Sequence, residues 1–181
     1  MANIENTSID QFFNYMEELD VEGIKSITNS GATVHIRPLN IKGEMVNEGV
    51  SFFKNLFYSF PDLLITQKNQ FLTKNNLAVC EIKLEGTQSK DFYGIINQKK
   101  HIDSDQVWTM KLENSKISDI SALWCQNQFL RRLGRSINHN PLMLRNLHLT
   151  MNAGVYGGLI QVISVIHFWL KCHNIFSLYI K

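Results

Sequence analysis

The chain has 181 residues, of which 44% are apolar and 19% are charged, and its formal net charge is +2. This length suits one ordinary domain with an extension, and the composition is that of a globular chain, which excludes a disordered one. The small net charge argues against a large basic surface, so we expect no nucleic-acid partner.

Cysteine usage and motif content narrow the class further. The three cysteines, Cys80, Cys125 and Cys172, lie far apart without metal-ligand spacing, so we expect no disulfide framework and no metal site. Residues 1–13 lack an apolar run of signal-peptide length, which predicts a cytoplasmic protein in a reducing compartment. Phosphate-binding glycine loops, dinucleotide fingerprints, CxxC and HExxH are missing, so we expect no cofactor.

The first third of the chain alternates between helical and extended patterns. Apolar residues after Ser8 recur at steps of three and four and predict a helix. Residues 21–28 extend this helical region up to Gly31, and the alternation over 33–37 predicts a strand. A second amphipathic helix is expected over 49–59, where Pro61 ends it.

Beyond Pro61 the apolar residues no longer recur at the three- and four-residue steps of a helix. They recur at every second residue, as in a strand. Strands are expected over 63–72, 77–86, 101–112 and 116–124. Polar turns at 75–76 and 113–115 favour antiparallel hairpins. Helices followed by a run of strands indicate an α+β fold whose bent sheet wraps around the helices, and the concave face is the expected ligand pocket.

Four short segments, in order and at matching spacing, resemble the SnoaL-like polyketide cyclases, relatives in fold of ketosteroid isomerase and nuclear transport factor 2. They are Phe60-Pro61-Asp62, Gly86-Thr87 with Asp91 to Gly94, Lys116-Ile117, and Phe129 to Gly134. The resemblance implies a cone-shaped domain over residues 1–136 with a strongly curved, mainly antiparallel sheet. It also implies a small carbonyl-bearing or polycyclic ligand, cofactor-free acid/base cyclisation or isomerisation, and a homo-oligomer.

Several positions depart from the family pattern. Gln88 stands where the family has His, and Lys90 and residues 97–99 replace other loop residues. The family's proton-transferring acid falls on Cys125, and a family His falls on Trp108. Cyclisation needs a base and a group that stabilises the enolate, and Trp serves neither role well. The alternative to an enzyme is therefore a non-catalytic ligand-binding or dimerisation module.

Other residues are candidates to replace the missing acid and base. Cys125 acts as a thiolate only if nearby arginines lower its pKa, and its alternative is an inert core thiol. His35, on the first strand, faces either a ligand or ordinary hydrogen-bond partners. His101, Asp103 and Asp105 share one strand face, so an Asp is a substitute base if that face points into the cone, and a solvated carboxylate if it points outward.

The expected walls of the pocket are Tyr15, Trp108, Leu123 and Trp124, although aromatic residues at such positions are also ordinary core. These alternatives lead to one structural test. An open cone that contains His35 and either Asp103 or Asp105 favours an enzyme, whereas a cone plugged by Trp108 favours the binding module.

The C-terminal part has a different character, with a linker expected over 137–152 and an apolar helix over 153–172. Residues 153–170 carry no formal charge and as a helix would span ~27 Å, near the ~30 Å of a bilayer core. Four arginines precede this segment, which suits a tail anchor with the domain on the cytoplasmic side. Gln161, His167 and three glycines weaken this interpretation. The alternatives are a helix packed on a partner and a poorly ordered extension.

Overall fold

The computed structural model describes residues 2–135, and side-chain surroundings from Ser8 onward. The expected linker over 137–152 and the apolar helix over 153–172 lie outside these residues. Within the described part, no helix is both long and apolar enough to cross a membrane.

Six strands form one sheet in the order β2-β1-β6-β5-β4-β3. The strands are β1 (Thr28–Ile36), β2 (Ile41–Glu44), β3 (Leu64–Leu72), β4 (Leu77–Thr87), β5 (His101–Glu113) and β6 (Lys116–Trp124). All neighbours are antiparallel except β1 and β6, which are parallel. The sheet is therefore mainly antiparallel, as the hairpin turns predict.

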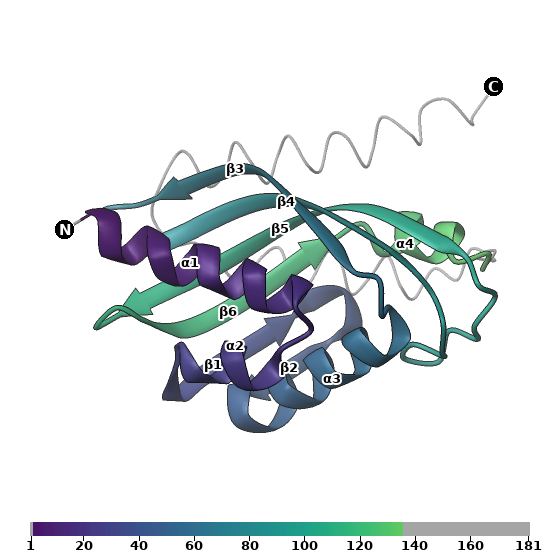
Figure 1. The fold of residues 1–181 in the computed structure, drawn as a ribbon, viewed down its shortest axis with the longest axis horizontal. Coiled ribbons are helices and arrows are strands. Elements are labelled where there is room, and N and C mark those ends of the chain that lie inside the picture. Colours follow the sequence, from purple (N-terminus) through teal and green to yellow (C-terminus); the bar gives the residue numbers. More distant parts are fainter. Residues whose placement is uncertain (1, 136–181) are drawn as a thin grey trace. The chain divides into compact units, whose positions relative to one another are not determined.

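Three helices, α1 (Ala2–Glu17), α2 (Val21–Ser26) and α3 (Val50–Ser59), lie on one side of this sheet (Figure 1). A fourth helix, α4 (Gln126–Arg132), follows β6 and lies at the end of the sheet. Two shorter turns, η1 (Arg37–Leu39) and η2 (Met45–Gly49), flank β2. The observed elements confirm the α+β class and the helix expected over 49–59.

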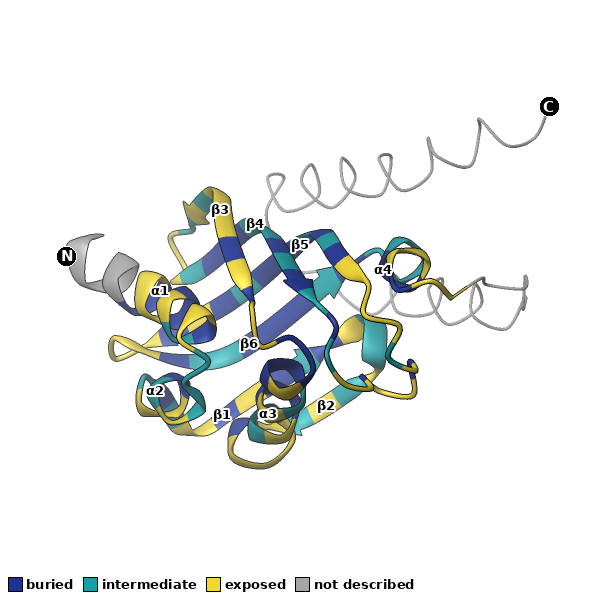
Figure 2. Ribbon diagram, turned by 45° about the vertical axis from the view of Figure 1, so that its right-hand side comes forward, coloured by how far each residue is buried: buried dark blue, intermediate teal, exposed yellow. Residues whose placement is uncertain are grey.

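The core lies between α1, α3 and the concave face of the sheet. Along β5, the even-numbered residues from Ile102 to Leu112 are buried and face the helices, because side chains alternate along a strand. Phe12 of α1 and Phe53 of α3 pack against Trp108 of β5. The alternation of buried and exposed residues along the strands is visible in Figure 2.

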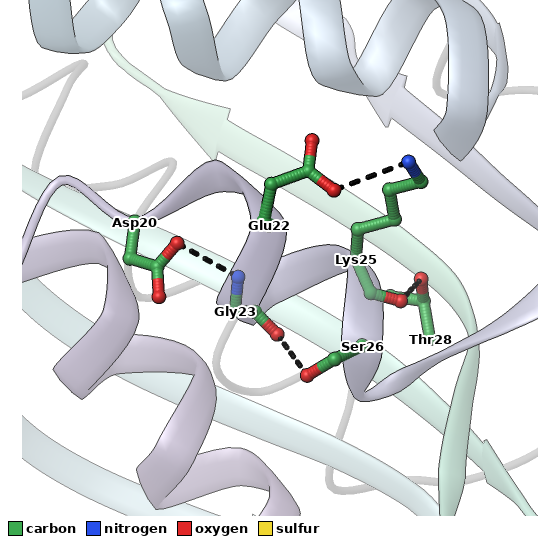
Figure 3. A network of polar contacts seen from close by, with 6 residues as sticks. All are labelled: Asp20, Glu22, Gly23, Lys25, Ser26 and Thr28. Atoms are coloured by element: carbon green, nitrogen blue, oxygen red, sulfur yellow. Dashed lines mark hydrogen bonds and ion pairs between the residues drawn. The ribbon is translucent and has the colours of Figure 1, made fainter.

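The turn between α1 and β1 differs from the prediction of a helical region continuing to residue 28. Leu19 adopts a positive φ of 57°, which ends α1, and Asp20 caps a separate short helix by accepting a hydrogen bond from Gly23 N at 2.8 Å. Ser26 and Thr28 then donate to the carbonyls of Gly23 and Lys25 (Figure 3). Strand β1 thus begins at Thr28 and contains Gly31 within a register shift.

Candidate functional site

The interior of the cone is almost filled. A cavity of about 10 Å³ lies between β4, β5, α3 and α4, and its walls are apolar apart from one amide. Its lining residues are Phe52, Leu56, Leu84, Phe92, Gln106, Trp108, Trp124 and Phe129. Of the predicted wall residues, the structure thus brings Trp108 and Trp124 to the cavity.

Trp108 is the side chain that fills the cone. It is fully buried, and its ring centroid lies 5.6 Å from that of Phe12 and 6.3 Å from that of Phe53. Contacts of this kind with several aromatic rings fix the orientation of the indole. Trp108 therefore plugs the cone at the position where the family resemblance places a His.

Gln106 is the polar group of the cavity, and the sequence reasoning missed it. Its Oε1 accepts a hydrogen bond from Trp108 Nε1 at 2.9 Å. Because the indole N–H can only donate, this bond fixes the amide and turns its donor nitrogen Nε2 away from the indole. The available sequence indication was its position two residues before Trp108, since residues at that spacing share a strand face.

The loop that follows β4 forms one wall of the cavity and is held from inside by Gln88. This side chain is 1% exposed and donates to Ile95 O at 3.1 Å, and its Oε1 accepts from Gln98 N at 3.4 Å. Phe92 and Ile95 exchange backbone hydrogen bonds across a tight turn. Gln88 thus organises the loop that carries the wall residue Phe92.

The acidic strand face predicted on β5 does not point into the cone. Asp103 and Asp105 lie on the face opposite Trp108, where Asp103 forms an ion pair with Lys83 at 3.3 Å and Asp105 forms one with Lys68. His101, on the same face, is exposed. The expectation of a substitute base from this strand is therefore corrected: strand alternation that buries Trp108 turns these carboxylates outward.

His35 also lies on the outer face, in an open groove of about 400 Å³ across β2, β1 and β6. Its neighbours in this groove include Arg37, Lys42, Asp119 and Ser121, and Arg37 Nε donates to Ser121 Oγ at 3.1 Å. Partial burial lowers the pKa of His35, and the positive charges of Arg37 and Lys42 lower it further. The structure thus separates His35 from the cone.

Cys125 follows β6 and is the N-cap residue of α4, where its carbonyl accepts a hydrogen bond from Phe129 N at 3.0 Å. It is half-buried and does not line the cavity. Burial raises the pKa of the other described cysteine, Cys80, to about 12, and the nearby Asp10 carboxylate adds to the shift. A thiol with that pKa is protonated at neutral pH and is not a nucleophile.

Tyr15 and Leu123, two predicted wall residues, are placed elsewhere. The ring of Tyr15 packs so closely on α2 that a Cβ on Gly23 would lie 2.5 Å from its Cδ1 atom. Leu123 pairs with Val107 on the sheet face opposite Trp108. Among the described residues, no group of three or more His, Cys, Asp or Glu is arranged to hold a metal ion.

Comparison with known proteins gives a fold. No protein-family model and no curated protein sequence matches the chain. Among solved structures, a proposed SnoaL-like polyketide cyclase from Jannaschia sp. CCS1 superimposes with a TM-score of 0.65 at 14% identity, over 74% of this chain and 94% of that one.

Two further structures agree. IdmH, a proposed polyketide cyclase from Streptomyces antibioticus, superimposes with a TM-score of 0.62 at 14% identity, over 72% of this chain and 99% of its own. A protein with a ketosteroid isomerase-like fold from Catenulispora acidiphila superimposes with a TM-score of 0.62 at 6% identity, over 74% of this chain and 97% of that one. The described part of this chain therefore has the nuclear transport factor 2-like fold of the SnoaL-like and ketosteroid isomerase-like proteins.

Proposed function

We propose that this chain is a small-molecule-binding module that performs no acid/base catalysis of its own. Its ligand is a small, flat molecule with one carbonyl group, which enters the aromatic cavity and accepts a hydrogen bond from Gln106. The observation that carries the proposal is the lining of the cone: eight residues, seven of them apolar or aromatic, and one amide donor.

The chemistry of the lining supports binding over turnover. Aromatic walls offer stacking surface to a flat ring, and a single placed donor fixes the orientation of a carbonyl oxygen. Removal of a proton next to that carbonyl needs a base within hydrogen-bond reach. None of the eight lining side chains titrates near neutral pH.

Entry of a ligand requires side chains to move, since an engineered cavity that binds benzene has roughly 150 Å³ and the cavity here has about 10 Å³. Trp108 packs against three aromatic rings, those of Phe12, Phe13 and Phe53. Phe52 instead stacks on Tyr93, whose side chain is 39% exposed. We place the opening at this Phe52 and Tyr93 side, where least core packing is lost.

The test compares a bicyclic ketone, 1-indanone, with its hydrocarbon analogue indane. Gln106→Met keeps the length of the side chain and removes the donor. We expect the variant to lose about fivefold in affinity for indanone and to keep its affinity for indane, since a neutral hydrogen bond contributes about 1 kcal/mol. Ligand-observed NMR titrations measure both affinities.

The outcomes separate binding from a permanently closed cone. Indanone binding that needs Gln106 supports the proposal. Binding that appears only after Trp108→Ala would show that the natural cone stays closed, and the chain would then be an interaction module without a ligand. Conversion of indanone to a new product by the natural chain would overturn the non-catalytic proposal.

A further inference from the structure

Exposed apolar side chains gather at the end of the domain formed by the β4–β5 loop and α4. Six large apolar side chains are exposed in the described part of the chain, and three of them, Tyr58, Tyr93 and Ile96, belong to this end. Ile96 is the most exposed, at 72%. A single exposed apolar residue is ordinary, but a group on one end is a mark of an interaction surface.

Basic side chains surround these apolar residues. Six exposed residues carry positive charge in two short segments: Lys90, Lys99 and Lys100 in the loop, and Arg131, Arg132 and Arg135 on or just after α4. They are a third of the 18 lysines and arginines, and without them the net charge of +2 would become −4. We call these six residues, with Tyr58, Tyr93 and Ile96, the basic end.

Contacts between neighbouring side chains and backbone join the loop, Tyr58 and the end of α4 into one surface. Arg135 Nη1 donates to Gly94 O at 3.3 Å, and Lys90 Nζ lies 5.8 Å from the ring centroid of Tyr58. Gly134 lies against Gln98, because a Cβ at this position would overlap with Gln98 Oε1. The loop and α4 are seen at the same end of the sheet in Figure 1.

The exposure of the loop tip is built into the fold. Tyr93 and Gly94 have positive φ values of 43° and 77°, which close the turn between Phe92 and Ile95. Asn97 fixes the base of the turn by donating from Nδ2 to Ser89 O at 2.6 Å. With Phe92 and Ile95 buried, the backbone presents Tyr93 and Ile96 to solvent.

We propose that the basic end docks the domain on an anionic lipid bilayer, with Ile96 and Tyr93 in the interface and the lysines and arginines at the headgroups. Aliphatic and aromatic residues beside lysines and arginines are the composition of surfaces that lie on such membranes. In the sequence, the described residues end at Arg135, and an uncharged apolar segment follows over 153–170. An exposed aliphatic side chain and this apolar continuation favour lipid over nucleic acid.

The test uses the full chain and co-sedimentation with two kinds of vesicle, phosphatidylcholine alone and phosphatidylcholine with phosphatidylserine. The test variant is Ile96→Ser with Lys99→Gln and Lys100→Gln. The matched control makes the same changes elsewhere on the surface: Val46→Ser with Lys42→Gln and Lys111→Gln, all at exposed positions. Melting curves check that both variants are folded.

We expect the natural chain to prefer the anionic vesicles and to lose this preference as salt rises, because the attraction acts within a Debye length. The test variant should bind anionic vesicles at least tenfold more weakly, and the control as well as the natural chain. Residues 136–181 are common to all three chains, so any contribution from them cancels. Equal losses in both variants would overturn the proposal, as would binding by the natural chain to a single-stranded oligonucleotide and not to vesicles.

Discussion

At the scale of single residues, the pair of Gln106 and Trp108 decides the character of the cone. Both side chains are on the inner face of β5, and the hydrogen bond between them satisfies the indole N–H in a buried site. The same strand register turns Asp103 and Asp105 to the outside, where lysines pair with them. The alternation of side chains along β5 therefore places Trp108 inside the cone and the two carboxylates outside it.

Trp108→Ala should destabilise the domain by about 3–5 kcal/mol, because it removes the largest fully buried side chain of the described residues and leaves a void. Urea unfolding measures this change. Tyr58→Ala, at an aromatic side chain that is 65% exposed, is the control and should stay within about 0.5 kcal/mol of the natural chain. Benzene should then stabilise the Trp108 variant more than the natural chain, because the variant offers it a preformed void. A mild effect of Trp108→Ala would contradict the account of the plug.

His35 provides a prediction on pH. Its pKa in the folded state lies below the usual 6.5, so between these two values the unfolded chain binds more protons than the folded one. The contribution of His35 to stability is therefore complete above pH 6.5 and is lost as the pH falls through the folded-state pKa. NMR titration of the imidazole, assigned with His35→Gln, measures that pKa.

Lys42→Gln should raise the pKa of His35 toward its usual value, because one of the neighbouring positive charges is removed. Lys25→Gln, on α2, removes a lysine that is not among the charges acting on His35 and should have no such effect. A His35 that titrates at or above 6.5 in the natural chain would contradict the geometry of this groove.

At the scale of elements, Gln88 is the buried side chain that holds the β4–β5 loop from inside. Gln88→Ala would leave the Ile95 carbonyl without its side-chain donor and should cost about 1–3 kcal/mol. The control Gln67→Ala, at an exposed position of β3, should be close to neutral. Hydrogen exchange should also be faster at the amides of residues 92–98 in the Gln88 variant alone. Equal stability of the two variants would show that the loop is held by other contacts.

Long periodic elements were predictable from the sequence, and short ones were not. Strands β4, β5 and β6 alternate over nine residues or more, so their bounds were predicted to within one residue. Strand β2 has four residues, none of them buried, and offers no apolar alternation to detect. The break at Leu19 and Asp20 depends on a positive φ at a leucine, which the local pattern does not indicate.

The candidate site was predictable in part for the same reason. Alternation puts His101, Asp103 and Asp105 on one face, as expected, but does not say which face is concave. That choice follows from the packing of α1 and α3 onto Trp108, which links residues far apart in the sequence. Gln106 was overlooked because a lone glutamine has no motif, although it shares a face with Trp108.

At the scale of the whole domain, the two proposals meet in the β4–β5 loop. Phe92 of this loop lines the cavity, and Tyr93 next to it stacks on the wall residue Phe52 and belongs to the basic end. A membrane-docked domain would thus hold the proposed opening of its cavity close to the bilayer, where apolar ligands dissolve. Ligand binding and membrane docking can be tested separately, because Gln106 is inside the cone and Ile96 is outside it.

The central claim is that the cone lacks a base, and hydrogen–deuterium exchange next to a carbonyl tests it most directly. NMR in D₂O follows the loss of the protons beside the carbonyl of 1-indanone, with the natural chain and with Gln106→Glu, which places a carboxylate in the same cavity. The account predicts that the natural chain leaves the exchange at its rate in buffer and that the glutamate variant accelerates it. Acceleration by the natural chain would show that the cone contains a base, which would contradict the proposed non-catalytic module and favour an enzyme.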